Sequence, residues 1–487
     1  MNLSVELVIL IPVMAGVLSM LMSTGKRSAL LSMALSGLTL IATTSMCIDV
    51  LTEGPIRYSL WYVDELSVIF VMLIAVISFM TSIYSYGYIS RDIEKGHIQS
   101  SDGRIYFVLL NIFTAVMFLT CLVSSMGLLW IAIEATTLIS AFLVGFYREK
   151  SSTEAAWKYL MLCSAGITLA LVGITLVYAA SLDVLAGTDS SLDWPILYDM
   201  AAELDPAIMK IAFVFIMIGF GTKIGLVPLH TWLPDAHSQA PTPVSALLSA
   251  VLLNCALYGL IRFKMIADVT LPGFTMYLFI GAGLISLIVA AMFIMNSTDI
   301  KRMFAYSSIE HMGIIMIGLG IGGPIAIFGV LFHIIAHSVS KSFTFLSVGN
   351  VISEYGTSDM TQIRGLRKRM PFSAFMLTAG MFAMAGLPPF AIFIGEITIL
   401  WGAVSSGMYI LAAVMVVFML IVFAGSARNV LPMMSGDPNG NVKEVRSMTM
   451  KVPLVALMFT SILLGLFMPE QMQDMLHSLT DLMGGII

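Results

Sequence analysis

The chain carries ionisable side chains inside long apolar runs, and three of them lie close together in FHIIAHSVSKSF, namely His333, His337 and Lys341. At about 100° per residue, an α-helix keeps this four-residue spacing within a sector of roughly 80° and spreads it over about 12 Å of the axis. Histidine titrates near neutral pH, so such a stripe can pass protons. A zinc site is the alternative, but no acidic motif or third ligand accompanies the pair of histidines, which favours the proton route.

Glu134 and Lys223 are two further ionisable residues in apolar surroundings. Glu134 lies in GLLWIAIEATTLISAFLVGFY, and Lys223 lies in GFGTKIGLVPLH. A charge at the centre of a membrane span costs about 2.5 to 3.5 kcal/mol, so such residues usually face a partner or a water-filled cavity. The alternatives are a permanently protonated Glu134 that joins helices and a Lys223 that extends to the membrane surface. A facing pair would hold both groups charged, and separating them would gate a proton.

Other protonatable residues could extend this route. Glu396, in FIGEITIL, is the last deep carboxylate, and the alternative is an interfacial residue near the outer end of a long helix. We expect three others on the cytoplasmic side, where they could take up protons from water or cap helix ends: His230, Asp235 and His237. Glu310 and His311 are adjacent in YSSIEHMGI and are further candidates for the relay.

The composition predicts that these residues lie in an integral membrane protein. The 487 residues are 59% hydrophobic and 11% charged, and the mean hydropathy is +0.96. Both values are far from those of soluble domains. No polar block is long enough to fold separately, so residues 1–487 are expected to form one membrane domain. The net charge of -5 is spread over the loops and leaves no footprint for nucleic acid.

Apolar runs of membrane-spanning length predict an all-α protein with about fourteen transmembrane helices. The runs do not alternate, which excludes a β-barrel. The first run has no basic leader or cleavage site and is interpreted as a retained span. The predicted spans are 3–22, 28–47, 66–88, 105–123, 127–147, 156–180, 208–230, 242–263, 272–295, 302–320, 324–350, 371–403, 407–427 and 452–469.

The seventh and twelfth spans are expected to be broken. The seventh contains Pro228 and is followed by Pro234, and the twelfth contains GLPPF near its middle. Proline removes a backbone donor, and breaks at corresponding positions of two halves indicate an inverted repeat with a transport site at its interface. The five-helix halves would be residues 105–263 and 272–427, flanked by spans one to three and fourteen.

Most of the 24 Lys and Arg residues fall in alternate loops, which predicts that both termini lie outside. The inner loops would hold Lys26, Arg27, Arg91, Lys95, Arg104, Arg148, Lys150, Lys158, Lys301, Arg302, Arg364, Arg367, Lys368, Arg369, Arg428, Lys443, Arg446 and Lys451. The outer side would hold Arg57, Lys210 and the acidic segment from Asp183 to Asp205. Arg262 and Lys264 would also lie outside, against the trend.

Cofactor sites are not predicted in this chain. Its four cysteines, Cys47, Cys121, Cys163 and Cys255, lie far apart in apolar runs, which argues against disulfides, zinc and iron–sulfur clusters. A glycine-rich nucleotide loop is also missing from the sequence. Energy for transport would therefore have to come from elsewhere.

Several of these stretches resemble a known family, the antiporter-like membrane subunits shared by respiratory complex I, Mrp-type sodium/proton antiporters and membrane-bound [NiFe] hydrogenases. The resemblance covers roughly residues 60–430 and is carried by KIGLVPLHTWLPDAHSQAPTPVSALLS, LYGLIRF, IKRMFAYSSIEHMGI, FHIIAHSVSKSF and AGLPPFAIFIGE. The stretches ALLSAVLLNC, WIAIEATTLISAFLVGFYR and AAWKYLMLCSAGI look most like the hydrogenase-4 and membrane-bound hydrogenase branch. The resemblance implies fourteen helices in two inverted five-helix halves.

The resemblance also implies a polar axis through the membrane midplane, formed by Glu134, Lys223, His333, His337, Lys341 and Glu396. Complex I relatives usually carry a lysine on the eighth helix, where this chain has Asn254. Water with His237, or a histidine of the eleventh helix, would have to bridge that position. The chain ends soon after the fourteenth span, so the long lateral helix of some complex I subunits is not expected.

The function expected from these features is proton or sodium translocation in a redox-driven complex of the prokaryotic cell membrane. Other membrane subunits and a peripheral arm would carry the iron–sulfur clusters and, in a hydrogenase, the NiFe centre. Electron transfer there would change the separation of Glu134 and Lys223 and send protons towards Lys341 and Glu396. The alternatives are the large subunit of a Mrp-type antiporter without a redox partner and a non-conducting membrane scaffold.

Overall fold

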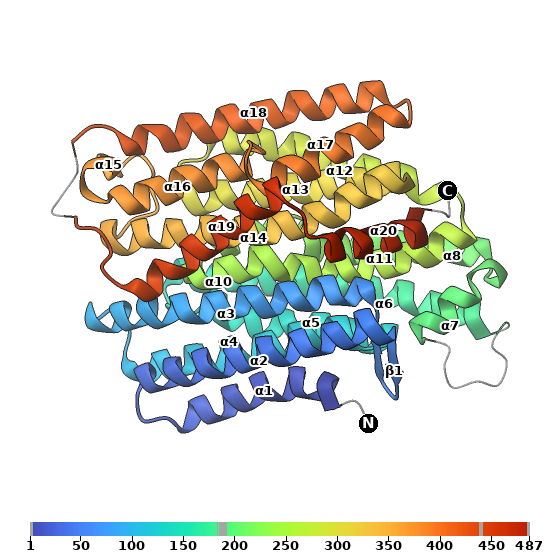
Figure 1. Cartoon of the computed structure of the whole chain (residues 1–487), viewed down its shortest axis with the longest axis horizontal. Coiled ribbons are helices and arrows are strands. Elements are labelled where there is room, and N and C mark those ends of the chain that lie inside the picture. The colour runs from blue at the N-terminus through green and yellow to red at the C-terminus, as the bar shows by residue number, and fades with distance from the viewer. Residues whose placement is uncertain (1–2, 183, 185–191, 438–441, 485–487) are drawn as a thin grey trace.

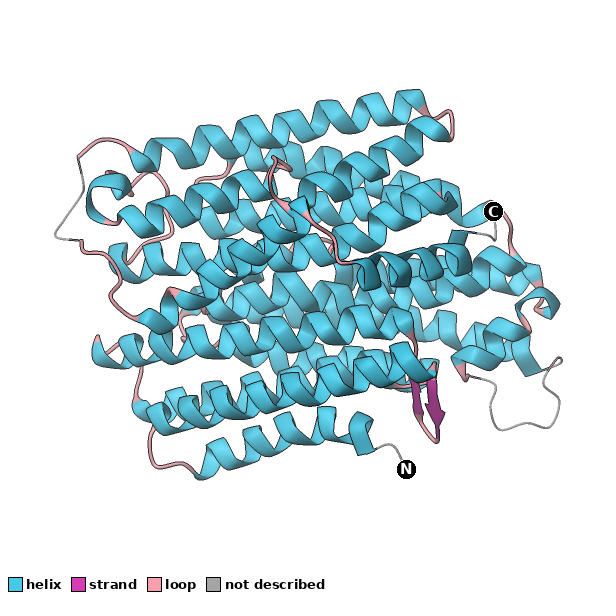
Figure 2. Cartoon of the chain, in the orientation of Figure 1, coloured by secondary structure: helices cyan, strands magenta, loops and turns pink. Residues whose placement is uncertain are grey.

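The computed structural model of the chain describes residues 3–182, 184, 192–437 and 442–484, and almost all of them are helical (Figure 2). The long helices are α1 (Leu3–Leu21), α2 (Gly25–Glu53), α3 (Glu65–Glu94), α4 (Ser100–Leu122), α5 (Met126–Val144), α6 (Lys150–Leu182), α8 (Pro206–Ile224), α11 (Leu253–Thr270), α12 (Phe274–Asn296), α13 (Ile300–Ile321), α14 (Gly323–Tyr355) and α18 (Tyr409–Met434). The shorter ones are α7 (Trp194–Asp199), α9 (Trp232–Gln239), α10 (Thr242–Leu247), α15 (Leu366–Arg369), α16 (Pro371–Met384), α17 (Ala391–Ser405), α19 (Val452–Leu466) and α20 (Glu470–Gly484). A hairpin of β1 (Ile56–Tyr58) and β2 (Trp61–Val63) joins α2 to α3.

The described residues contain 13 helices that are long and apolar enough to cross a membrane. The apolar helices α16 and α17 are each shorter, and together they occupy the twelfth predicted span. The prediction of an all-helical, multi-pass protein with about fourteen spans is therefore confirmed. Of the acidic segment predicted on the outer side, Asp183 and Asp189 lie outside the described residues.

Both predicted helix breaks are present. In the seventh span α8 ends at Gly225, whose φ is 89°, and the chain resumes as α9 after Pro228. In the twelfth span α16 is followed by Gly386, with φ of 62°, and by the two prolines before α17. Left-handed backbone strongly favours glycine, and proline lacks the N–H that would continue a helix. The shared order of glycine, leucine and proline supports our proposal that residues 105–263 and 272–427 are repeats.

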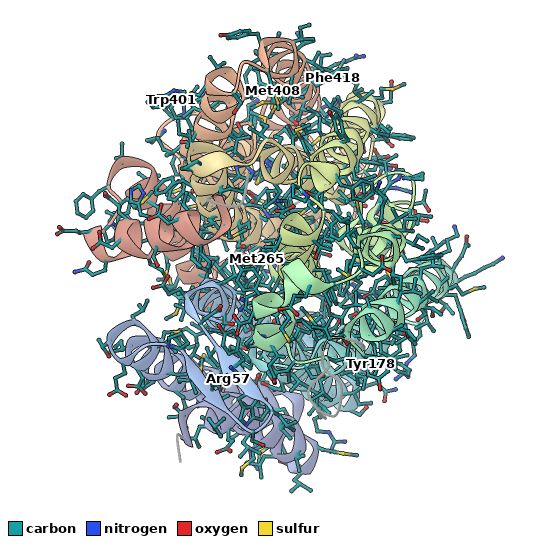
Figure 3. All side chains as sticks on the ribbon, turned by 90° about the vertical axis from the view of Figure 1, so that its right-hand side faces the viewer. Arg57, Tyr178, Met265, Trp401, Met408 and Phe418 are labelled. Carbon is teal, nitrogen blue, oxygen red and sulfur yellow. The ribbon has the colours of Figure 1, made fainter. Side chains whose placement is uncertain are left out.

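The helices run side by side along the long axis, with α1 and α2 at one edge of the bundle and α18 at the opposite edge (Figure 1). The hairpin and α7 lie at one end, and the basic helix α15 lies at the other, which supports the predicted sidedness. The end-on view places Met265 of α11 near the centre and Trp401 of α17 at the periphery (Figure 3). Their exposures of 2% and 64% agree with these positions.

The core consists of the segment 241–268, which is buried throughout, and of α13 and α14, which are buried along most of their length. The segment 248–252, labelled η2, is a π-helical turn between α10 and α11 and was not predicted. Polar groups on these elements cannot reach water outside the protein. They must find partners inside it, because an unpaired buried polar group is costly.

The structure corrects the environment of Arg262 and Lys264, which the loop assignment counted among the loop cations of the outer side. Both are buried in α11, with 2% and 3% of their areas exposed. Arg262 donates to both carboxylate oxygens of Asp64 at 2.7 and 2.5 Å, and its guanidinium lies 4.3 Å from the Trp194 ring centroid. Lys264 pairs with Asp268, one turn along the same helix. These cations break the loop pattern because internal carboxylates neutralise them.

The C-terminal helix α20 was also not predicted. It packs along α14 and α3, and Leu476, Leu479 and Met483 form its buried stripe. Acidic residues on the other face, such as Asp474 and Asp481, lower its mean hydropathy, so it does not register as a span. It is an amphipathic helix that covers the bundle.

Removing Asp64 should strongly destabilise the protein. The change Asp64→Ala leaves the Arg262 charge buried without its partner, a loss worth about 3 to 5 kcal/mol. We expect a clearly lower melting temperature of the detergent-solubilised protein. The control is Asp437→Ala, because the Lys368–Asp437 pair is 61% and 95% exposed and should contribute nothing measurable. Equal melting of the two variants would contradict the structural role of Asp64.

Candidate functional site

Lys223 occupies the last turn of α8, directly before the first helix break, and is completely buried. Its ammonium donates to Thr137 Oγ1 at 2.8 Å and to the Tyr159 hydroxyl at 2.6 Å. The Tyr159 hydroxyl also lies 2.7 Å from Ser140 Oγ. Lys223 is thus linked to α5 and α6 through neutral hydroxyl groups.

Close packing of α6 against α8 brings these groups together. A Cβ atom at Gly219 would lie 2.5 Å from the Cβ of Ala170, so glycine is needed for the two backbones to approach. The Tyr159 ring packs on Trp232, with ring centroids 4.8 Å apart, and Trp232 donates to the backbone oxygen of Thr222. The segment after the break therefore closes over Lys223.

Glu134 lies on α5, three residues before Thr137, and is half-buried. Its Oε1 accepts a hydrogen bond of 2.6 Å from Ser164, whereas Oε2 is buried without a protein partner in the described chain. The sequence suggested Glu134 and Lys223 as an ion pair. In the structure the carboxylate of Glu134 and the ammonium of Lys223 lie more than 4.0 Å apart. Lys223 is instead bound one helical turn away, at Thr137.

Lys341 has similar surroundings in the second half of the chain. It is completely buried on α14 and donates to the backbone oxygen of Phe304 at 2.7 Å and to Ser307 Oγ at 2.5 Å. Glu310 follows Ser307 by three residues on α13, and its Oε2 has no protein partner among the described residues. In each half, therefore, a buried lysine is bound to a hydroxyl that lies three residues from a glutamate.

The histidines of the predicted stripe meet His311 of α13. The ring centroid of His311 lies 5.2 Å from that of His333 and 5.3 Å from that of His337. All three rings are completely buried. Neither ring nitrogen of His333 or His337 has a hydrogen-bond partner in the described chain. Each of these nitrogens therefore keeps its capacity to donate or accept a hydrogen bond.

Glu396 of α17 joins this cluster at the second helix break. Its Oε1 lies 3.6 Å from His311 Nδ1, and only 5% of the residue is exposed. The left-handed Gly386 makes room for the carboxylate, because a Cβ atom at that position would come within 1.9 Å of Glu396 Oε2. This burial argues against the interfacial alternative for Glu396. His311, His333 and Glu396 also bring three potential metal ligands within 4.8 Å of one another.

Asn254 connects the eighth span to α14, just after the π-helical turn. Its Nδ2 donates to Ser338 Oγ and to the backbone oxygen of Ala250, both at 2.7 Å. Ser249 and Ser308, one from the turn and one from α13, share a hydrogen bond of 2.7 Å. π-Helical turns are frequent at functional sites because they redirect side chains. The turn therefore places polar groups between the two lysine sites.

The residues predicted on the cytoplasmic side separate into two environments. His237 is completely buried, stacks on Phe345 at 5.2 Å and has no hydrogen-bond partner for either nitrogen in the described chain. His230 is 7% exposed and lies near Tyr306. Asp235, by contrast, binds Lys158 and Arg302 in a surface ion network. It does not contact the buried groups directly.

Sequence reasoning missed Lys301, which it assigned to an inner loop. The structure buries Lys301 in the first turn of α13, where its ammonium donates to the backbone oxygens of Ser238 and Ala240 at the end of α9. Asp299 could have indicated that Lys301 lies in a helix. It is a helix-capping residue that accepts a hydrogen bond from the backbone N–H of Arg302, so the helix begins before Lys301. Tyr159, Thr137 and Ser307 were missed because hydroxyls leave no hydropathy signal.

Comparison with protein families gives two matches. Residues 123–424 match the family described as NADH:quinone oxidoreductase/Mrp antiporter, TM. Residues 57–96 match the family described as NADH-Ubiquinone oxidoreductase (complex I), chain 5 N-terminus. The chain is 37% identical over 417 residues to the hydrogenase-4 component F homolog of Methylacidiphilum infernorum, covering 85% of this chain and 87% of that one. It is 31% identical to hydrogenase-4 component B of Escherichia coli, covering 68% of this chain and 49% of the relative.

Solved structures share the fold at low sequence identity. The archaeal membrane-bound sulfane sulfur reductase contains a chain with a TM-score of 0.86 and 20% identity, matched over 98% of this chain and 97% of its own. A chain of the Mrp complex from Dietzia sp. DQ12-45-1b matches with a TM-score of 0.85 and 18% identity, over 99% of this chain and 97% of its own. A chain of respiratory complex I from Thermus thermophilus matches with a TM-score of 0.84 and 22% identity, over 99% of both chains.

Adding one methyl group beside His333 should disturb the histidine cluster. A Cβ atom at Gly395 would lie 2.8 Å from both Cβ and Nδ1 of His333, so Gly395→Ala forces α14 and α17 apart. Overpacking of this kind costs about 1 to 3 kcal/mol and lowers the melting temperature. The control is Gly281→Ala in α12, where the added methyl meets nothing within 4 Å. Unchanged melting of the Gly395 variant would show that the helices are not in close contact there.

Proposed function

This chain belongs to the NADH:quinone oxidoreductase/Mrp antiporter family of membrane subunits, and we propose that it moves protons in a redox-driven complex of the hydrogenase type. Antiporter-like, ion-translocating subunits of this family work within multisubunit membrane complexes. The choice of a hydrogenase-type complex is supported by the 37% identity to the hydrogenase-4 component F homolog, which extends over most of both chains.

The observation that carries the proposal is the contrast between two kinds of buried cation. Arg262 and Lys264 are paired with Asp64 and Asp268, so their charges are fixed. The ammonium groups of Lys223 and Lys341 donate only to hydroxyl and carbonyl oxygens, and no carboxylate of the described chain lies within 4.0 Å of either.

A buried charge without a counter-ion is unfavourable, whereas a neutral amine can keep hydrogen bonds to the same groups. Lys223 and Lys341 are therefore suited to gain and lose protons during a cycle. A scaffold would need neither of them, and keeping two such lysines in the membrane would only destabilise it. This reasoning favours translocation over the scaffold alternative.

We propose the following route for protons. Glu134 exchanges a proton with Lys223 when their separation changes, because Oε2 of Glu134 is free and Thr137 lies one turn away. The hydroxyls at the π-helical turn and the Asn254–Ser338 contact lead to α14. There His337 and Lys341 pass the proton to His311 and Glu396, with internal water between groups that do not touch. Lys301 and His237 provide uptake from the cytoplasmic side, near the buried His230 and the surface residue Asp235.

The free energy for this transport comes, in our proposal, from a partner. Moving one charge against 100 mV costs about 2.3 kcal/mol, and we expect iron–sulfur clusters and a NiFe centre in the subunits that supply it. The location we propose is the cytoplasmic membrane of a prokaryote. A Mrp-type antiporter, driven by an ion gradient alone, is the second candidate. It is supported by the structural match to the Dietzia Mrp complex, whose TM-score of 0.85 is close to the 0.86 of the sulfane sulfur reductase.

Replacing Lys223 should slow translocation strongly without preventing assembly. For Lys223→Ala we expect at least a tenfold slower proton flux, because the proton carrier next to the helix break is lost. The flux is measured with a pH-sensitive dye in vesicles that contain the reconstituted complex. The matched control is Lys210→Ala, an exposed lysine near the start of the same helix. If the Lys223 variant assembled and pumped at the normal rate, the scaffold alternative would be favoured.

Purification in mild detergent should distinguish the two transport candidates. A complex of the hydrogenase type should bring peripheral subunits with iron and nickel, detectable by elemental analysis. A Mrp-type antiporter should bring only membrane subunits. Metal-free preparations that still exchange sodium for protons in vesicles would overturn the redox-driven proposal.

A further inference from the structure

Three potential metal ligands converge in the membrane interior where α13, α14 and α17 meet. One atom each from His311, His333 and Glu396 lies within 4.8 Å of the other two, and all three residues are buried. They come from separate helices, so their meeting is a property of the fold and not of local sequence. The sequence suggested His333 and His337 as a pair without a third ligand, whereas the structure joins His333 to His311 and to Glu396, which lies 63 residues after His333.

The hydrogen bond of His311 orients its ring for metal binding. Nε2 lies 3.1 Å from the backbone oxygen of Met384, which can only accept, so Nε2 carries the hydrogen. In the neutral ring this leaves the lone pair on Nδ1, the atom that faces Glu396 Oε1 at 3.6 Å. Metal-binding histidines usually donate their other N–H to a backbone carbonyl or carboxylate in this way.

The spacing of His311 and Glu396 suits a small divalent ion, and the donor atom of His333 lies within 4.8 Å of both. Two lone-pair donors that face each other need a proton or a cation between them. With metal–ligand bonds of about 2.0 to 2.1 Å, neighbouring donors of a tetrahedral site lie about 3.3 Å apart. The observed 3.6 Å is close to that value. His333 Nδ1 lies beside Gly395, the residue that precedes Glu396, and has no other partner in the described chain.

The donor types select the class of ion. Two imidazole nitrogens and one carboxylate oxygen are ligands that zinc accepts, with a fourth position left open for water. Magnesium and calcium prefer sites made entirely of oxygen. We propose that His311, His333 and Glu396 bind a zinc-class divalent metal ion. In this chain the same groups lie on the proposed proton route, so bound zinc should arrest translocation, a consequence that rests on the proposed function.

Direct measurement of zinc binding tests the site independently of transport. The purified complex is treated with a chelator and titrated with Zn²⁺, bound metal is counted by elemental analysis, and X-ray absorption reports the ligands. We expect one tightly bound zinc with nitrogen and oxygen ligands and no sulfur. His333→Gln and Glu396→Gln should each weaken zinc affinity at least tenfold. Even the loss of a group that only hydrogen-bonds to a metal ligand lowers metal affinity about 10- to 100-fold.

The control is His97→Gln, which removes a histidine whose side chain is 57% exposed and far from the cluster in sequence. It should leave the tight zinc unchanged. The inference is overturned if the wild-type complex binds no stoichiometric zinc, or if the His333 and Glu396 variants bind it as tightly as the wild type. Zinc that binds as expected without slowing proton flux overturns the proposed block. Failure of the proposed function is recognised separately, by normal pumping in the Lys223 variant.

Discussion

A membrane interior tolerates a charge only when something inside the protein stabilises it, and this constraint organises the whole chain. Arg262 shows one solution, in which Asp64, Tyr258 and the Trp194 ring surround a permanent cation and fix it to its neighbours. Lys223 and Lys341 show the other solution, in which hydroxyl and carbonyl oxygens accept from an amine that can be charged or neutral. The first arrangement stabilises the fold. In our proposal the second makes proton transfer possible at the expense of stability.

The fold creates the second arrangement by interrupting its helices. At Gly225 a left-handed residue ends α8, and the following segment closes over Lys223. At Gly386 a left-handed residue follows α16 and makes room for the carboxylate of Glu396 on α17. In the eighth span the interruption is the π-helical turn before Asn254, and no proline lies within that turn. Regular helices satisfy every backbone group internally, so backbone groups become available to a polar interior only where a helix is interrupted.

The sequence predicted the helices, both breaks and the buried residues of the axis, because hydropathy, proline and isolated charges act locally. Sequence-based prediction failed for residues whose interaction partners lie far away in the sequence. Arg262 looked like a loop cation because Asp64 is 198 residues away. Lys301 looked exposed because hydropathy ignores the Asp299 cap, and the amphipathic α20 is too polar to register. The convergence of His311 with Glu396 depends on the packing of α13 against α17, which no periodicity encodes.

The two lysine sites share a feature that suggests how they could switch. Lys223 binds Thr137, three residues from Glu134, and Lys341 binds Ser307, three residues from Glu310. Residues three apart on a helix lie on the same face, one turn from each other. In our proposal the ammonium leaves the hydroxyl and reaches the carboxylate by a movement of roughly 4.5 Å, the rise of three residues. The hydroxyl-bound and carboxylate-bound positions would favour opposite protonation states. A small displacement of α8 or α14, imposed by a partner, would then be enough to release a proton in one direction.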